Sequence, residues 1–284
     1  MRTFLLLITV FTLGNVFGQK ERIKGNKILS TETQELEAFH TIEIYENFEV
    51  TLDESNDPYV KIETDSNVHE YIKVEVVDSV LTISSEKDLR RTKALHLDIF
   101  YTSDVQKIIL HDKVTIKSLS PIETPKLTIE THGNTEAFIT ADVGQIECIT
   151  NDKSNVVLHV TGQEASYQIN ENSKLEGIIT ADTLKVDAYQ KGNVTLEGEL
   201  KMLLVRVDNN TNFYGEKLKC DMVSISAEGT SDSYILSNQA TTIEARDKAE
   251  IFLLGESKIS INTFTNEVIL YKKNIDYTPN KFKL

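Results

Sequence analysis

The feature that most constrains the fold of this chain is a nineteen-residue period that runs from about residue 135 to residue 265. Apolar side chains recur in columns at that spacing. The first column contains Val156, Leu175, Val194 and Phe213, and it resumes at Ile251 after an interruption at Asp232. The second contains Ile146, Ala165, Leu184, Leu203 and Met222, and the third contains Cys148, Tyr167, Val186, Val205, Ser224 and Ile243. Such a period is typical of solenoids, in which each coil buries its apolar face only against its neighbours.

Within each coil, apolar and polar residues alternate as they do in a strand with one buried face. In the coil that begins near residue 155, the inward positions are Val156, Leu158, Val160, Ala165, Tyr167 and Ile169. Gly162 interrupts this strand, and a turn follows at residues 170–174. Short crossovers between parallel strands wind right-handed. The sequence therefore predicts an all-β fold, a right-handed parallel β-helix (β-solenoid) of about 19-residue coils. An antiparallel meander would also explain the strands, but it gives no reason for the columns.

The two ends of the chain differ from this regular middle. Residues 1–18 have the parts of a secretory signal peptide, namely the basic Arg2, an apolar run from Phe4 to Leu13 and, for cleavage after Gly18, small or tolerated residues at the −3 and −1 positions, Val16 and Gly18. The run is about half the length of a membrane-spanning helix, so no transmembrane span is expected in the mature chain. We expect a flexible leader at 19–37, an irregular β-rich cap with the first coils at 38–113, the regular solenoid at 114–271 and a tail at 272–284. The protein is expected to be exported, to the periplasm, the cell surface or the medium.

The charge of the chain excludes some partners. It has 30 Lys and Arg against 44 Asp and Glu, a net charge of −14. Removal of residues 1–18 takes away only Arg2, which leaves 29 − 44 = −15. Nucleic-acid affinity rests on Lys and Arg that neutralise phosphates, so no nucleic-acid partner is expected. Acidic lipid headgroups are disfavoured for the same reason.

One polar column follows the turns on the same nineteen-residue grid. It contains Asp152, Glu171, Gln190, Asn209, Glu228 and Asp247. Oxygen ligands spaced by about 4.8 Å suit a hard cation such as Ca²⁺. These residue types also favour turns for backbone reasons, and lysines lie beside three of them. We therefore expect solvated turn residues and no metal or cofactor, with Ca²⁺ on the acidic ladder Asp152, Glu171, Glu228 and Asp247 as the alternative.

A second outward column contains Asp187 and Arg206 on adjacent coils, followed by Glu244. An acid beside a base on one face is what a polysaccharide-cleaving β-helix enzyme would need. Such a pair is more often a cross-strand ion pair of small energy, so no catalytic residue is assigned. The six histidines show no close pair with metal-ligand spacing, and no nucleophile elbow or phosphate-binding glycine loop is present in the sequence.

The two cysteines are placed differently by the period. Cys148 lies in an apolar column and is expected to be buried. Cys220 falls in a polar column with Gln163, Asp182 and Lys201. The two are nearly four coils apart, about 18 Å at about 4.8 Å per coil, whereas a disulfide requires Cα atoms within about 7 Å. No intramolecular disulfide is predicted, and dimerisation through Cys220 stays open.

Two segments near the start of the chain carry a resemblance to a known family. They are GNKILSTETQELEAFHTIEIYENFEVTL (25–52) and DPYVKIETDSNVHEYIKVEVVDSVLTIS (57–84). Their order of strands resembles the opening of the bacterial head GIN domain, labelled a putative auto-transporter adhesin, and turns such as HGN, QKGN and AEGTS look like that family's solenoid half. The resemblance covers about residues 25–271. It implies an exported, envelope-associated β-solenoid of unknown function without an assigned enzymatic activity.

Three functions follow from these observations. The favoured one is a non-catalytic binding, adhesion or scaffold module whose partner is an unknown protein or glycan of the envelope or of a host surface. The alternative is a polysaccharide-active β-helix enzyme that uses the face of Asp187 and Arg206. The second alternative is a structural spacer that self-associates through the open ends of its solenoid, which would make the chain a homo-oligomer.

Overall fold

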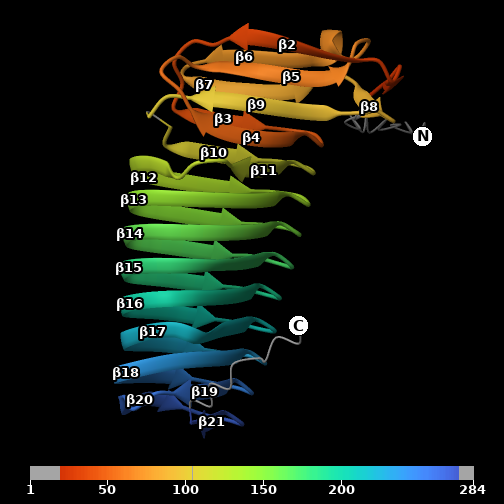
Figure 1. Cartoon of the computed structure of the whole chain (residues 1–284). Coiled ribbons are helices and arrows are strands. Elements are labelled where there is room, and N and C mark those ends of the chain that lie inside the picture. Colours follow the sequence, from red (N-terminus) through yellow and green to blue (C-terminus); the bar gives the residue numbers. More distant parts are fainter. Residues whose placement is uncertain (1–19, 104, 275–284) are drawn as a thin grey trace, which may run out of the picture.

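The computed structural model describes residues 20–103 and 105–274, and these form a β-solenoid of about nine turns beneath an N-terminal cap (Figure 1). The β-solenoid with coils of about nineteen residues is thus confirmed. The predicted signal peptide at residues 1–18 lies outside the described residues, and so do residues 275–284 of the predicted tail. In the described part of the chain, no helix has the length and hydrophobicity needed to cross a membrane.

The cap consists of short strands that pair partly in antiparallel and partly in parallel. They are β1 (Arg22–Lys24), β2 (Leu29–Glu35), β3 (Thr41–Ile44), β4 (Glu49–Glu54), β5 (Tyr59–Asp65), β6 (Ile72–Val77), β7 (Val80–Ser85), β8 (Asp88–Arg90) and β9 (Leu95–Tyr101), with one 3-10 turn, η1 (His69–Tyr71). β2 and β9 pair with β5 in antiparallel, as does β6 with β7. β3 lies parallel to both β7 and β10, and β4 lies parallel to both β9 and β11. Parallel stacking therefore begins inside the cap.

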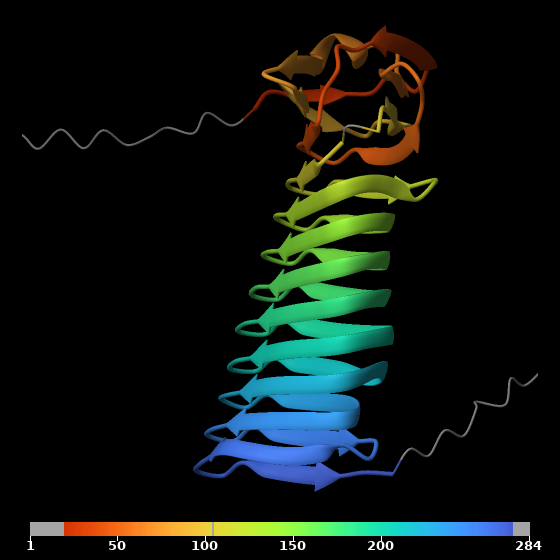
Figure 2. The ribbon, with the colours of Figure 1, turned by 90° about the vertical axis from the view of Figure 1, so that its left-hand side faces the viewer.

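Below the cap, each regular coil is one long strand that bends midway and one tight turn (Figures 1 and 2). The strands are β10 (Lys107–Leu110), β11 (Thr115–Ser118), β12 (Ile122–Thr131), β13 (Glu136–Thr150), β14 (Asn155–Ile169), β15 (Lys174–Ala188), β16 (Asn193–Val207), β17 (Asn212–Ala227), β18 (Asp232–Ala245), β19 (Glu250–Leu254), β20 (Lys258–Phe264) and β21 (Ile269–Lys272). Neighbouring coils pair in parallel along almost their whole length. All the tight turns lie along one edge of the stack, on the right in Figure 1.

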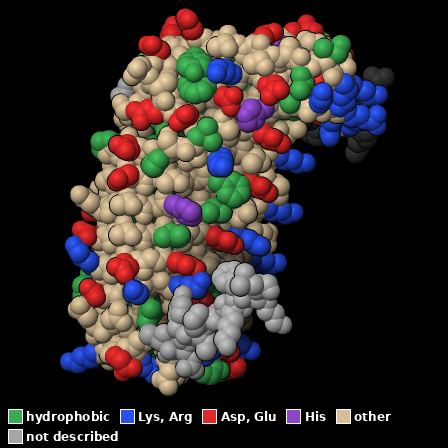
Figure 3. Space-filling model, in the orientation of Figure 1, with side chains coloured by type: hydrophobic (Ala, Val, Ile, Leu, Met, Phe, Trp, Pro, Cys, Tyr) green, Lys and Arg blue, Asp and Glu red, His purple; other side chains and the backbone are tan. Residues whose placement is uncertain are grey.

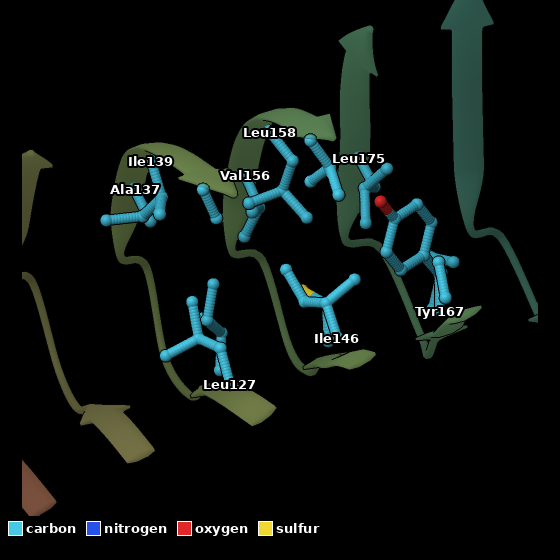
Figure 4. Packing of buried hydrophobic residues seen from close by; sticks show 14 of the residues in the cluster. Leu127, Ala137, Ile139, Ile146, Val156, Leu158, Tyr167 and Leu175 are labelled. Atoms are coloured by element: carbon cyan, nitrogen blue, oxygen red, sulfur yellow. The ribbon is translucent and has the colours of Figure 1, made fainter. Parts of the chain in front are cut away.

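The core is a continuous column of inward side chains between the two arms of each coil. Figure 4 shows Ala137, Val156 and Leu175 on one arm facing Leu127, Ile146 and Tyr167 on the other. The first predicted column is confirmed, because Val156, Leu175, Val194 and Phe213 are register partners and fully buried. Cys148 is buried as predicted, and burial raises the pKa of its thiol to about 12. Each coil thus covers the apolar face of the next, as a solenoid requires.

One extra residue in β17 moves the register of the later columns. Thr195 pairs with Tyr214 at nineteen residues, but Glu197 pairs with Lys217 at twenty, and the next coil returns to the grid by being shorter. A strict period is therefore wrong between about residues 216 and 237. The columns pass through Val223 instead of Met222, Ile225 instead of Ser224 and Ser233 instead of Asp232. The apparent polar interruptions arose from this insertion.

The same insertion corrects the placement of Cys220. Cys220 pairs with Leu200, an inward residue, instead of falling beside Lys201. Its side chain is 1% exposed, and burial raises the pKa of its thiol to about 12. A buried, protonated thiol does not reach a second molecule, so dimerisation through Cys220 is wrong. Both cysteines are free.

Residues 19–37 were expected to be a flexible leader, and the structure differs from that expectation at residues 20–37. β1 and β2 lie in this segment, and β2 pairs with β5 over seven residues, from Leu29 to Glu35. β2 is an edge strand with mostly exposed side chains, so its sequence shows no apolar alternation. Its order comes from backbone pairing, which leaves no hydrophobic pattern in the sequence.

Candidate functional site

The candidate site begins with a small projection of the cap that lies over the turn edge. β1 and β8 form a separate two-stranded parallel sheet. We call residues 20–27 and 86–93 the overhang. It projects at the end of the cap that lies above the turns of the stack (Figure 1). Leu89 is buried and Ile23 packs against the core, so the overhang is part of the folded cap.

A buried carboxylate fastens the two segments of the overhang together. Asp65, at the end of β5, is fully buried. Its two oxygens accept the backbone N–H groups of Lys27 and, at 2.5 Å, of Lys93. Burial opposes the ionisation of Asp65, but these hydrogen bonds together with the charge of Lys27 outweigh it and lower its pKa. Gly25 is required beside it, because a Cβ there would lie 2.6 Å from the carboxyl group.

The overhang is basic although the chain as a whole is acidic. It carries eight Lys or Arg against three Asp or Glu, a net charge of +5 on a chain of net −14. Figure 3 shows these basic side chains gathered at one end of the cap, with further lysines down the edge of the stack below. Two of the acids are paired internally, Asp88 with Arg90 at 2.7 Å and Glu21 with Lys87 at 2.8 Å. The overhang therefore presents a local positive field.

The floor of the site is the turn edge, where each turn contains one residue in the left-handed backbone region. These residues are Glu46, Asp112, Gly133, Asp152, Glu171, Gln190, Asn209, Gly229, Asp247 and Asn266. The carbonyl of each of the first nine accepts a hydrogen bond from the turn of the next coil, as in Lys153 N–H to Gly133 O at 2.9 Å. The following residue of each turn is exposed or half-buried, and its side chain forms the outer surface of the edge.

A groove of about 790 Å³ separates the overhang from the upper turns. We call it the cap groove. Its lining residues are Lys20, Glu46, Asn47, Asp88, Leu89, Arg90, Asp112, Lys113, Gly133, Asn134, Asp152, Lys153, Glu171 and Asn172. The lining contains charged and amide side chains with only one apolar residue, Leu89. It is suited to a polar ligand rather than to an apolar one.

The acidic ladder predicted from the sequence lies on this edge, with one correction. Asp152, Glu171 and Asp247 occupy left-handed turn positions, but Gly229 takes the place expected for Glu228 because of the extra residue in β17. Glu228 instead lies 3.8 Å from Arg246. The carboxylate of Asp152 accepts the backbone N–H of Gly133 at 2.6 Å. Within the described residues, no group of three or more His, Cys, Asp or Glu is placed to hold a metal ion.

The two residues of the predicted glycan-active face, Asp187 and Arg206, lie on another part of the stack. They are register partners on β15 and β16, so the structure places them side by side on one face. Asp187 forms its ion pair with Lys185 of its own strand, and this pairing raises the pKa of Lys185. The guanidinium of Arg206 lies 5.8 Å from the ring centre of Tyr189. Asp187 and Arg206 are therefore each engaged with another side chain.

A column of aromatic and imidazole rings near the cap was not predicted from the sequence. The rings of Tyr45 and His111 stack with centroids 4.2 Å apart, and those of His111 and His132 with centroids 5.1 Å apart. His132 lies 2.9 Å from Glu130. Burial opposes the ionisation of Glu130, but hydrogen bonds with His132 and Lys107 outweigh it and lower its pKa. The two histidines are 21 residues apart, one irregular coil, which a strict nineteen-residue grid does not bring together.

Comparisons with known proteins agree with this fold. A family model described as "Putative auto-transporter adhesin, head GIN domain" matches residues 38–178 and 159–257. A putative adhesin from Parabacteroides distasonis has a TM-score of 0.70, and one from Parabacteroides merdae 0.66, each at 15% identity. A structure from Parabacteroides distasonis named a putative lipid binding protein has a TM-score of 0.59 at 14% identity. Each of the three matches covers 89% of this chain and 100% of the other. A search of curated proteins found no match.

Proposed function

Since the chain belongs to the family described as "Putative auto-transporter adhesin, head GIN domain", we propose that it is an exported, non-catalytic binding module. Its partner is a protein or glycan of the cell envelope or of a host surface. The observation that carries this proposal is the cap groove, a polar hollow of about 790 Å³ between the basic overhang and the turn edge. The solenoid beneath it is a rigid stack, so the groove is held open without a ligand.

The groove differs from the rest of the surface in shape. The regular faces of β13 to β18 are long parallel sheets, whereas the groove joins two segments of the cap to five successive turns. Binding sites are commonly concave surfaces with a few oriented polar groups. We assign ligand binding to this end of the molecule and a spacing role to the coils below.

Binding to a panel of surfaces tests this function. The protein from residue 20 onward is immobilised through its C-terminus and exposed to a panel of glycans and extracellular matrix proteins. It is expected to bind at least one member of the panel saturably. A variant that carries charge reversals at both Arg90 and Arg91 in the overhang should lose most of that retention. Equal retention by both chains, or no retention from any panel member, would contradict the proposal.

Self-association is a second candidate, and the last coil carries the observation that favours it. Ile259, Ile261 and Phe264 of β20 are the register partners of buried residues in β18, yet they are 39%, 49% and 42% exposed. Their register partners in β18 lie in the core, but no further coil of the described chain covers these three side chains. β20 carries a single charged residue, Lys258, so two copies can approach through this end without like-charge repulsion. The occupant we assign is a second copy related by a two-fold axis.

The oligomeric state decides this second candidate. Light scattering of the mature chain is expected to give a dimer that Ile261→Lys converts to a monomer, because the charge would be buried in the interface. Ile178→Lys is the control, since Ile178 is also exposed, at 50%, but lies on the outer face of β15. A wild-type monomer at all accessible concentrations would remove self-association and leave the binding function intact.

A further inference from the structure

We propose that the cap groove and the turn edge below it bind a linear acidic glycan, a polysaccharide whose sugar carboxylates recur along its chain. The inference rests on the proposed function, because it names the class of ligand for that same site. It follows from the side chains that the turns present, from the internal pairing of the acids in the groove and from the charge of the overhang.

Three lysines in the upper part of the turn edge lie at every second coil. The hydrogen bonds between turns fix the order of coils, in which Lys113, Lys153 and Lys191 are each separated by one intervening turn. With about 4.8 Å per coil, the backbone positions of successive lysines lie about 10 Å apart. Among the described residues, none of the three forms an ion pair with a carboxylate. Lysine is a compact point charge that suits isolated carboxylates at such intervals.

Asparagines occupy the turns between these lysines. Asn47, Asn134 and Asn172 line the groove, and the order down the edge is Asn47, Lys113, Asn134, Lys153, Asn172. In the described part of the chain, the side chains of these three asparagines make no hydrogen bond within the protein. An amide both donates and accepts, as recognition of sugar hydroxyls requires. An alternation of amides and ammonium groups therefore matches a chain of hydroxyls interrupted by carboxylates.

The acids that line the groove are mostly engaged by the protein itself. Asp112 accepts the backbone N–H of Glu46 at 2.9 Å, and Asp152 accepts that of Gly133 at 2.6 Å. Glu46 forms an ion pair with Lys20. Their charges are therefore partly offset within the protein.

Two further acids complete the lining. Asp88 is paired with Arg22 at 3.5 Å and with Arg90 at 2.7 Å. Among the described residues, Glu171 is the one lining carboxylate that has neither a hydrogen bond nor an ion pair within the protein. The negative charge of Glu171 should weaken the binding of an anion. Replacement of Glu171 by the neutral glutamine should therefore strengthen that binding.

The overhang supplies the remaining positive charge. Lys24, Arg91 and Lys93 are exposed, and within the described residues none is paired with a carboxylate. They stand on a segment that Asp65 holds in place. These three side chains lie outside the groove lining and add to the positive field of the overhang beside it. Localised positive fields of this kind raise the rate at which an anionic ligand associates, even when the net charge of the protein has the same sign as that of the ligand.

The geometry favours a glycan over two other anionic partners. Nucleic acids carry a phosphate about every 3.4 Å on each strand, far denser than lysines about 10 Å apart, and their single strands bind through stacking on aromatic side chains. The groove lining contains no aromatic residue. A lipid surface is planar and does not enter a groove beneath an overhang. A linear polysaccharide is narrow enough to do so.

Calorimetry with hyaluronan oligomers, a linear probe in which every second sugar is a uronate, tests the inference in the presence of EDTA. The protein from residue 20 onward is expected to bind them, and affinity should fall as salt is raised from 50 to 300 mM because exposed charges are screened. The same oligomers as methyl esters keep the sugar chain and lose the charge, so they should bind at least about tenfold more weakly. Equal binding of the acid and the ester, or no binding of the acid, would overturn the inference.

A pair of double variants locates the site. Lys113→Glu with Lys153→Glu should weaken binding by about tenfold or more, because two contacts become repulsive. Lys117→Glu with Lys126→Glu makes the same change in net charge at exposed positions outside the groove lining and should change affinity less than twofold. Glu171→Gln should strengthen binding. All of these side chains are exposed, and unchanged circular dichroism confirms that each variant folds.

The remaining outcomes separate this inference from the proposed function. Equal loss of affinity in the two double variants would show a general charge effect and overturn it. Tighter binding of single-stranded DNA or of phosphatidylglycerol vesicles than of the hyaluronan oligomers would assign the surface to another partner and overturn it too. Retention of a neutral glycan or a protein in the panel above, without uronate binding, would leave the proposed function standing. Failure in both experiments would remove both.

Discussion

Replacement of Gly198 by alanine is expected to destabilise the solenoid by about 3 kcal/mol or more. Gly198 lies at the midpoint of β16 with φ at +127°, a conformation that L side chains rarely adopt. A Cβ there would lie 1.9 Å from the carbonyl oxygen of Ile179 on the neighbouring coil. The obstacle is backbone, so the coils must separate locally to admit the methyl group. Chemical denaturation of the two proteins measures the loss of stability.

Gly192→Ala is the matched control in the same coil. Its Cβ would meet a side-chain methyl of Ile169 at 2.9 Å, which can move aside, and its φ lies outside the left-handed region. We expect a loss below about 1 kcal/mol there. Similar losses at both positions would show that the close approach of β15 and β16 at Gly198 is not a constraint on the fold.

Asp65→Asn is expected to release the overhang. The change replaces one hydrogen-bond acceptor by a donor that faces a backbone N–H of Lys27 or Lys93. A charge-assisted hydrogen bond and the cost of an unsatisfied buried group together amount to about 3 kcal/mol, or about a hundredfold more of the detached state. Trypsin reports this directly, because the overhang is rich in Lys and Arg and should be cut much faster in the variant. Asp57→Asn, at an exposed position, should leave the rate of cleavage unchanged.

The same carboxylate makes the overhang sensitive to acid. Because folding lowers the pKa of Asp65, its ionised form stabilises the overhang above the ordinary carboxyl range, and this stabilisation is lost as the pH falls through the lowered value. The amide resonances of Lys27 and Lys93 should move together below about pH 4. Amides that titrate independently of one another would contradict a shared attachment to Asp65.

The nineteen-residue period predicted the fold and most of its core because in-register stacking forces like residues into columns. Val156, Leu175 and Cys148 were placed correctly for that reason. The single extra residue in β17 could not be recognised from the sequence. A strict period places polar residues such as Ser224 in the columns there, and such residues are common in strands. Only the burial of Ile225 and Cys220 reveals the shift.

Much less of the candidate site could be predicted from the sequence. Three of the four acidic turn positions, Asp152, Glu171 and Asp247, were found, and so was the adjacency of Asp187 and Arg206, because all of them lie on the grid. The overhang was missed because it joins segments more than sixty residues apart, and because its parallel pairing leaves no apolar alternation. The link between them is Asp65, a single buried acid at the end of an ordinary strand.

Hydrogen exchange of the chain with a partner retained from the binding panel tests the central claim most directly, namely that ligands bind between the overhang and the turn edge. Binding is expected to slow exchange in residues 20–27 and 86–93 and in the turns around Lys113 and Lys153. The outer face of β15 to β17, including Asp187 and Arg206, should exchange at the rate of the free protein. Protection confined to that outer face, with none in the overhang and upper turns, would contradict the account.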